Sequence, residues 1–272
     1  MIVIRNCVGF DELEACVQLQ VETWGYDPTD VIPLKAHRVA QKIGGQIMGA
    51  FDTEFPGTPA EGSSDSLVGF VLSLPGVKSG NGAPHAYLHS HMLAVREGYR
   101  NRGLGARLKL EQRQEALSRG IRHMEWTFDP LEIKNAYLNV HKLGAIVRSY
   151  EVNFYGVSSS RLQGGLPTDR LVAEWHMDSP RVQAILAGHR AAESIAERIV
   201  VPAAIYEWKG SEAGRERALA VQLENRSKFQ QAFSQGLAVV SFVRDEQGNG
   251  VFGLGPFSQI QDASTPKEYK DL

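Results

Sequence analysis

Cysteine is scarce in this sequence, and the long apolar runs of membrane proteins are missing. The 272 residues include two cysteines, Cys7 and Cys16, whose spacing matches neither a metal-binding pattern nor a disulfide framework. We therefore expect no metal site, a reducing compartment and two small buried apolar side chains. No apolar run approaches the ~20 residues that a bilayer-spanning helix requires.

The N-terminal segment also lacks the features of an export signal. MIVIRNCVGF has no basic leader followed by a long apolar stretch and a small-residue cleavage site. These absences predict a cytoplasmic protein that does not bind membranes. The formal net charge of -2 argues against a broad nucleic-acid-binding surface.

Hydrophobic periodicity and turn residues predict strands and helices over the first 178 residues. The N-terminal order is a strand (2–5), a helix with Asp11 as N-cap, a helix (34–42), and strands at 46–51, 67–74 and 86–95. A helix (103–119), a strand (121–128), a helix opened by Asp129 and ending at Gly144, and strands at 145–155 and 170–177 follow. This order indicates an α/β unit.

Residues 179–272 are organised differently. They contain a predicted strand (198–201), a long helix (215–233), and two strands (237–243 and 251–254) joined by the turn Gly248-Asn249-Gly250. No motif in this segment indicates chemistry. It could pack on the first unit, extend its sheet or cover an acceptor cleft. We expect an accessory strand-helix-hairpin subdomain docked on a first domain of residues 1–178.

The most informative stretch is HMLAVREGYRNRGLGARL, residues 91–108. An apolar strand end is followed by a short polar turn and then by a helix. The first N–H groups of a helix lack partners, so they can bind a pyrophosphate. Gly103 and Gly105 let the backbone approach the phosphates, and Arg100 and Arg102 add positive charge nearby.

Two glycines alone are weak evidence, because many strand-to-helix turns need glycine. Other phosphate-binding motifs fit poorly. No Gly-Lys-Ser/Thr follows, which excludes a P-loop, and the dinucleotide spacing G-x-G-x-x-G ends in Leu108. The whole run, from strand end through R-x-x-G-x-G to the helix, favours a phosphate site.

This run resembles the acyl-CoA-binding signature of the GNAT superfamily of N-acetyltransferases, and it matches at Arg100, Gly103 and Gly105. The predicted element order up to residue 178 agrees, and Lys142-Leu143-Gly144-Ala145 is similar to the family's K-x-G-F signature. The resemblance implies an α/β (α+β) fold with a GNAT-like mixed central sheet flanked by helices. It also implies direct transfer of an acetyl group from acetyl-CoA to an amine.

Within this resemblance, the strand end offers backbone groups to the pantetheine arm, and the loop and helix start hold the pyrophosphate. The first set is Leu93, Ala94 and Val95; the second is Arg100, Asn101, Arg102, Gly103, Leu104, Gly105 and Ala106. Asn135, in the later helix, is a candidate second contact to CoA. The chain also resembles predicted bacterial acetyltransferases with a C-terminal extension and undefined substrate, so no acceptor is implied.

Acyl transfer to an amine requires a base, a stabilised oxyanion and a proton for the leaving thiolate. His89 and His91 precede the loop, and strand alternation predicts that they share a face with Leu93 and Val95. In several relatives a catalytic glutamate occupies the position of His89, which makes His89 our first candidate base and Glu125 the second. The alternative for His89 is a partly buried structural histidine, and for His91 that interpretation is favoured.

The chain departs from the family at the position of the usual acid. Many relatives have a tyrosine four residues before the glycine of K-x-G-F, and this position is Val140 here. Tyr137 and His141, four residues apart on one helix face, are the nearby candidates.

Three hypotheses follow. The first is an N-acyltransferase acting on a small-molecule or peptide amine, with the acceptor selected by loops at 53–66 and 75–85 and by the C-terminal segment. The second is a non-catalytic acyl-CoA sensor, suggested by Val140. The third gives the C-terminal segment a role in forming a homodimer.

Overall fold

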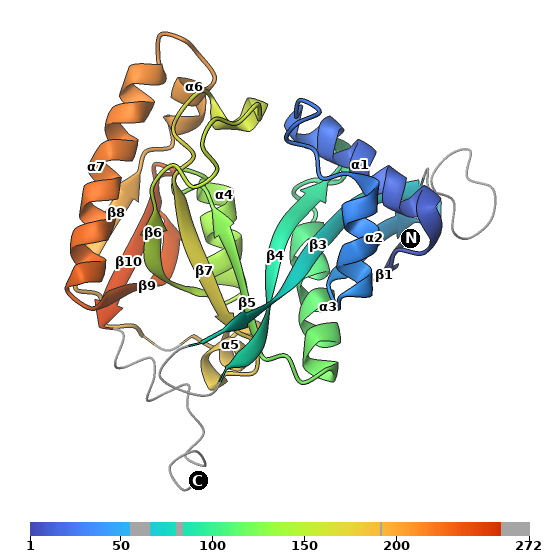
Figure 1. The fold of residues 1–272 in the computed structure, drawn as a ribbon. Coiled ribbons are helices and arrows are strands. Elements are labelled where there is room, and N and C mark those ends of the chain that lie inside the picture. The colour runs from blue at the N-terminus through green and yellow to red at the C-terminus, as the bar shows by residue number, and fades with distance from the viewer. Residues whose placement is uncertain (55–65, 80–83, 191, 257–272) are drawn as a thin grey trace, which may run out of the picture. The chain divides into compact units, whose positions relative to one another are not determined.

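The computed structural model describes residues 1–54, 66–79, 84–190 and 192–256, so most of the predicted 53–66 loop lies outside the described residues. The chain forms two compact units (Figure 1). The first contains Met1–Glu125 and Ser159–Leu162, and the second contains Trp126–Ser158 and the chain from Gln163 onward. Residues 179–256 thus share a unit with residues 163–178. The division of the chain into a domain of residues 1–178 and a subdomain of residues 179–272 stays a prediction.

The first unit has a mixed sheet in the order β1-β2-β3-β4-β5. Antiparallel pairing joins β1 through β4, and β4 pairs with β5 in parallel. Its elements are β1 (Ile2–Asn6), α1 (Gly9–Trp24), α2 (Leu34–Lys42), β2 (Gln46–Asp52), β3 (Leu67–Lys78), β4 (His85–Val95), η2 (Glu97–Tyr99), α3 (Leu104–Ser118) and the first residues of β5 (His123–Phe128).

Two apolar cores lie on the two faces of this sheet. Side chains alternate along β2, so Ile47 packs with α1 and α2 while Met48 packs with α3. Cys7 and Cys16 are buried in the α1–α2 core with their Sγ atoms 3.7 Å apart. This confirms the expectation that they are small buried side chains.

The predicted start of α1 is wrong. The helix begins at Gly9, whose φ of 71° only glycine adopts readily, and its N-cap is Val8 rather than Asp11. The Val8 N–H donates to Glu12 Oε2 at 2.7 Å, and Arg5 binds the same carboxylate. Glu12 therefore supplies the helix-start contact that we assigned to Asp11.

The second unit has strands in the order β7-β6-β9-β10-β8. β9 pairs antiparallel with β6 at Val147 and Val239, so the C-terminal strands extend the sheet of β6 and β7. This is the second of the three predicted placements. The elements are the end of β5, α4 (Ile133–Ala136), η3 (Tyr137–Lys142), β6 (Ile146–Glu151), β7 (Arg170–His176), α5 (Pro180–Leu186), β8 (Glu197–Val201), α6 (Ile205–Lys209), α7 (Arg215–Ser234), β9 (Leu237–Arg244) and β10 (Gly250–Pro256).

Aromatic side chains and one buried ion pair attach α7 to this sheet. The Phe229 ring lies 5.2 Å from that of Phe252 and 5.8 Å from that of Tyr150. Arg226 donates two hydrogen bonds to the fully buried Asp169, at 2.8 and 3.0 Å. Tyr150 donates a third at 2.6 Å.

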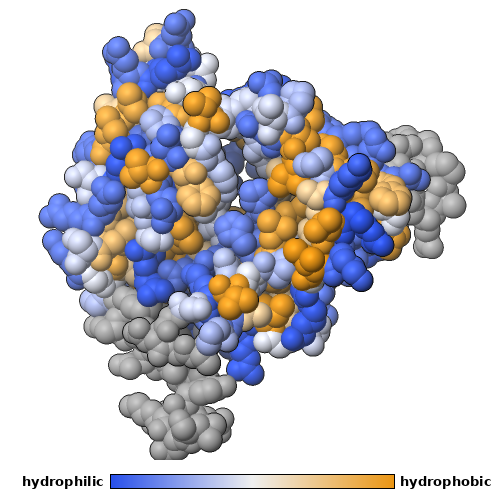
Figure 2. Space-filling view, in the orientation of Figure 1, coloured by the Kyte–Doolittle hydropathy of each residue, from blue (hydrophilic) through white to orange (hydrophobic). Residues whose placement is uncertain are grey.

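Mixed sheets flanked by helices confirm the predicted α/β (α+β) class. Apolar and polar residues are interspersed on the face seen in Figure 2. Across the described ranges, no helix is long and apolar enough to cross a membrane.

Candidate functional site

The edge of β4 that faces away from β3 is open at its C-terminal end within the first unit. The Arg96 N–H donates to Val68 O on β3 at 2.8 Å, and N–H groups alternate in direction along a strand. The backbone groups of Leu93 and Val95 therefore point to the opposite edge. Among the described residues, β5 pairs with β4 only at Leu88 and His89, before this stretch. An extended ligand containing amides could pair with the open edge.

The loop after β4 has the backbone geometry of an anion site. Asn101 and Gly103 have φ values of 61° and 77°, and α3 begins at Leu104 without a side-chain cap. In the part of the chain that the structure describes, the N–H groups of Leu104, Gly105 and Ala106 have no acceptor. A Cβ on Gly103 would meet no atom within 4 Å, so its φ, not packing, requires glycine.

Two arginines add positive charge to this loop. Arg100 Nε donates to Val95 O at 2.9 Å, which fixes the side chain beside the strand end. The Arg102 guanidinium lies 5.7 Å from the ring centroid of Tyr99, and Tyr99 donates to Asp52 Oδ2 at 2.7 Å. Neither arginine has an ion pair within the described ranges. Open amides and two cations together suit a pyrophosphate.

A β-bulge interrupts β4 just before the open edge. Met92 pairs with Leu72, but Ser90 pairs with Ser73, so His91 is the extra residue of the bulge. Such a bulge changes which side chains face each side of the sheet.

The prediction that His89 shares a face with Leu93 and Val95 is wrong for this reason. Ser90 Oγ accepts a hydrogen bond from Lys109 Nζ of α3 at 2.6 Å, so Ser90 faces α3 and His89 faces the opposite side. Leu93 and Val95, beyond the bulge, pack with the α3 core.

His89 is held in the neutral form. Burial lowers the pKa of His89 below its ordinary value, Lys109 and Lys78 act in the same direction, and Glu125 opposes them. Burial, together with His89, lowers the pKa of His91 to about 4. A neutral imidazole at pH 7 is the form that a general base requires.

Glu125 is the register partner of His89 on β5. Burial would raise its pKa, but hydrogen bonding to His123 and Lys78 outweighs burial and holds the pKa at about 2. Lys78 forms an ion pair with this carboxylate, and His123 Nε2 lies 3.2 Å from Oε1. Sequence reasoning missed Lys78 because it lies on another strand. It also missed His123, although His123 is two residues before Glu125 on β5 and strand alternation places both side chains on one face. Glu125 is thus a paired, weakly basic carboxylate, and its catalytic role stays a prediction.

In the second unit, Tyr137 and His141 stack with ring centroids 4.3 Å apart. His141 Nδ1 donates to Phe242 O at 3.1 Å, and its Nε2 accepts from Arg190 at 2.7 Å. These partners define the neutral tautomer, and burial with Arg190 and Lys142 lowers the pKa of His141. Both ring nitrogens of His141 are therefore occupied.

The remaining predicted residues of this helix differ in exposure. Val140 is buried, whereas Asn135 is exposed near the start of α4. The residues found by sequence thus form two groups. The loop, His89 and Glu125 belong to the first unit, and Asn135, Tyr137 and His141 to the second.

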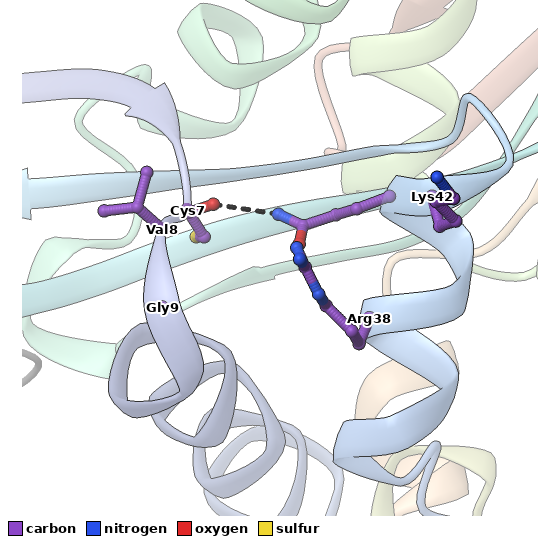
Figure 3. A pocket seen from close by; sticks show the side chains of 6 residues that line it. Cys7, Val8, Gly9, Arg38 and Lys42 are labelled. Atoms are coloured by element: carbon purple, nitrogen blue, oxygen red, sulfur yellow. Dashed lines mark hydrogen bonds between the residues drawn. The ribbon is translucent and has the colours of Figure 1, made fainter.

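A cavity of about 420 Å³ lies between the start of α1 and the end of α2 (Figure 3). The Gln41 side chain donates to Cys7 O at 2.8 Å across it. None of the predicted site residues lines this cavity, so it gives no support to a site there.

Comparison with known proteins agrees with the loop geometry. Residues 35–144 match the model of the acetyltransferase (GNAT) family, and this range includes the loop and Gly144. This part of the chain is therefore similar to a GNAT acetyltransferase domain. No curated protein matches its sequence significantly.

Solved structures show the same fold. The Arabidopsis thaliana NAA60 structure with acetyl-CoA is 16% identical, with a TM-score of 0.52 over 64% of this chain and 98% of that one. The structure of the same protein with a bisubstrate analogue is 16% identical in sequence and has a TM-score of 0.50. The match covers 64% of this chain and 97% of that chain. At this identity the likeness establishes a shared fold and nothing about the acceptor.

Proposed function

We propose that this protein is an acetyl-CoA-dependent N-acetyltransferase that acts on an amine of a small molecule or a peptide. One observation carries the proposal. The unpartnered amides at the start of α3 lie beside Arg100 and Arg102, in a segment that matches the GNAT family model. Anion binding at this helix start would hold the pyrophosphate of the CoA thioester.

The neighbouring backbone supports the same assignment. The open edge at Leu93 to Val95 can pair with the amide groups of the pantetheine arm, which would direct the thioester along β4. Asn135 is exposed and stays the proposed second contact to CoA.

In the proposed reaction, the acceptor nitrogen attacks the thioester carbonyl carbon, a C–N bond forms and the C–S bond breaks. His89, neutral at pH 7, accepts the proton from the attacking amine. The thiolate leaves and takes up a proton. Tyr137 is the stronger candidate acid, because both ring nitrogens of His141 are already hydrogen-bonded.

Turnover tests this proposal directly. Acetyl-CoA is incubated with a panel of small-molecule and N-terminal peptide amines, and released thiol is measured. We expect amine-dependent thiol release that is lost in Gly103→Asp, because a carboxylate at the N-cap repels the pyrophosphate. Thiol release no faster than acetyl-CoA hydrolysis with every amine would contradict the assignment.

A non-catalytic acyl-CoA sensor is the second candidate. Val140 stands at the position of the usual acid, and His141 is committed to Phe242 and Arg190. Firm acetyl-CoA binding without turnover on any amine would favour this candidate. The cytoplasmic location and a homodimer formed through the C-terminal segment stay predictions.

A further inference from the structure

A buried cation from the C-terminal segment lies at the turn before α4. Lys209 Nζ, on α6, is 2.7 Å from Asp129 Oδ2 and 3.2 Å from Glu132 Oε1. The exposed fractions of the three side chains are 6%, 10% and 24%. Burial alone would lower the pKa of Lys209, but the two carboxylates outweigh it and raise the pKa. The amine is therefore charged.

Burying such a cluster gains little stability, because the desolvation of the charges offsets their attraction. The cluster does fix the local geometry. Asp129 Oδ1 accepts the Leu131 N–H at 2.8 Å while Oδ2 contacts Lys209. The Glu132 carbonyl then accepts the Ala136 N–H at 2.9 Å, in the first turn of the helix. Lys209 thus fixes the carboxylate that orders the turn leading into α4.

Tyr206 makes a second contact to the same helix start. Its hydroxyl accepts the Lys134 N–H at 3.3 Å, and partial burial raises the pKa of the phenol to about 12, so it stays protonated. Tyr206 and Lys209 are three residues apart on α6 and share one helix face. The backbone of Lys209 also abuts Gly164, where a Cβ would come within 2.7 Å of Lys209 O. Only glycine therefore fits at position 164 beside this end of α6.

We propose that Lys209 and Tyr206 are positioning residues for acyl-CoA binding, acting from the C-terminal segment on the start of α4. The contact at Lys134 lies next to Asn135, whose exposed side chain is the proposed CoA contact of that helix. The inference rests on the proposed function. It gives residues 179–256 a part in binding the CoA thioester, which the chain's sequence motifs do not suggest.

Affinity and kinetics test this inference in the full-length chain. Lys209→Met and Tyr206→Phe are compared with Lys209→Arg and with Lys228→Met, which alters an exposed lysine of α7 paired with Glu224. We expect the Kd and KM for acetyl-CoA to rise about tenfold in the first two, which corresponds to about 1.4 kcal/mol, close to the net contribution of one hydrogen bond. We expect kcat to change little, Lys209→Arg to retain most of the affinity, and Lys228→Met to match the wild type. Tyr206→Phe changes no charge and remains informative if Lys209→Met does not fold.

Amide hydrogen exchange over residues 130–136 provides a readout that does not depend on CoA. Faster exchange there in Tyr206→Phe, together with the raised Kd, supports the inference. A folded Tyr206→Phe variant with wild-type Kd and wild-type exchange overturns it. If the wild-type chain does not bind acetyl-CoA, the proposed function fails and so does the role in binding. The exchange rates then report separately whether the two residues hold the helix.

Discussion

His89 and His91 lie two residues apart on β4 and are both neutral at pH 7, yet only one has a proposed role. His91 is the extra residue of the bulge, and the centroid of its ring lies 6.0 Å from that of His89. A bulge can be located only when the partner strand is known, so the sequence predicted the strand that carries both histidines but the wrong face for His89. The same limit hid Lys78, on β3, as a partner of Glu125. His123, two residues before Glu125 on β5, could have been found from strand alternation.

The His89→Gln variant tests the base. The base must be unprotonated, and the pKa of His89 lies below its ordinary 6.5, so wild-type activity should fall as pH drops below that value. Removing the base should lower kcat by about 100-fold or more and abolish this acidic limb. The measurement is a kcat profile from pH 5 to 8. If the pH profile of kcat is unchanged in His89→Gln, His89 is a structural residue and not the base.

His91 makes a prediction about stability. Its pKa is about 4 in the folded chain and ordinarily 6.5, so between these pH values only the unfolded chain takes up the proton. The free energy of unfolding should therefore fall as pH drops from 6.5 to 4, by up to about 3 kcal/mol from this residue. Urea unfolding of wild type and His91→Gln across this range measures the difference. If the free energy of unfolding depends on pH equally in wild type and in His91→Gln, the low pKa of His91 in the folded chain is contradicted.

At the scale of elements, the loop between β4 and α3 was the most predictable part of the site. Its glycine spacing, its arginines and the following helix are all local in sequence. The long helices and strands were also predicted, because the residue pattern that indicates each of them is local in sequence. The short helices α5 and α6 were missed because too few turns reveal a helical period, and the π-helical η3 reads like an ordinary helix.

Two glycines of this loop form a matched pair for mutation. Gly103 has φ of 77°, whereas Gly98 lies outside the left-handed region, and a Cβ on either would meet open space. Gly103→Ala should cost about 1–2 kcal/mol in strain and weaken acetyl-CoA binding, because the alanine shifts the loop toward ordinary φ. Gly98→Ala should leave binding unchanged. Thermal unfolding and calorimetric titration check both, and equal effects of the two substitutions would contradict the loop geometry.

At the scale of the whole molecule, the C-terminal strands extend the sheet of β6 and β7, one of three placements that the sequence left open. Sheet extension depends on which edge strand accepts a new partner, and nothing local to residues 237–243 encodes the partner. Arg226, on α7, likewise meets Asp169 across a long sequence separation. Only the three-dimensional structure shows that this pair connects α7 to the start of β7.

Arg226→Met tests that connection. Asp169 is fully buried, so removing its cation leaves an uncompensated charge and should destabilise the chain by about 3–5 kcal/mol. Arg217→Met, an exposed substitution on the same helix, should change stability by less than about 0.5 kcal/mol. Urea unfolding compares them. Equal free energies of unfolding for Arg226→Met and Arg217→Met would show that the ion pair of Arg226 and Asp169 does not hold α7 in place.

The central claim is that the start of α3 binds the pyrophosphate of acetyl-CoA, and a calorimetric titration tests it most directly. Wild-type chain should bind acetyl-CoA with one site and gain about 2.7 kcal/mol of stability at a ligand concentration of 100 times Kd. Gly103→Asp should lose this binding while remaining folded. No heat and no stabilisation of the wild type at millimolar acetyl-CoA, or equal binding by Gly103→Asp, would contradict the account.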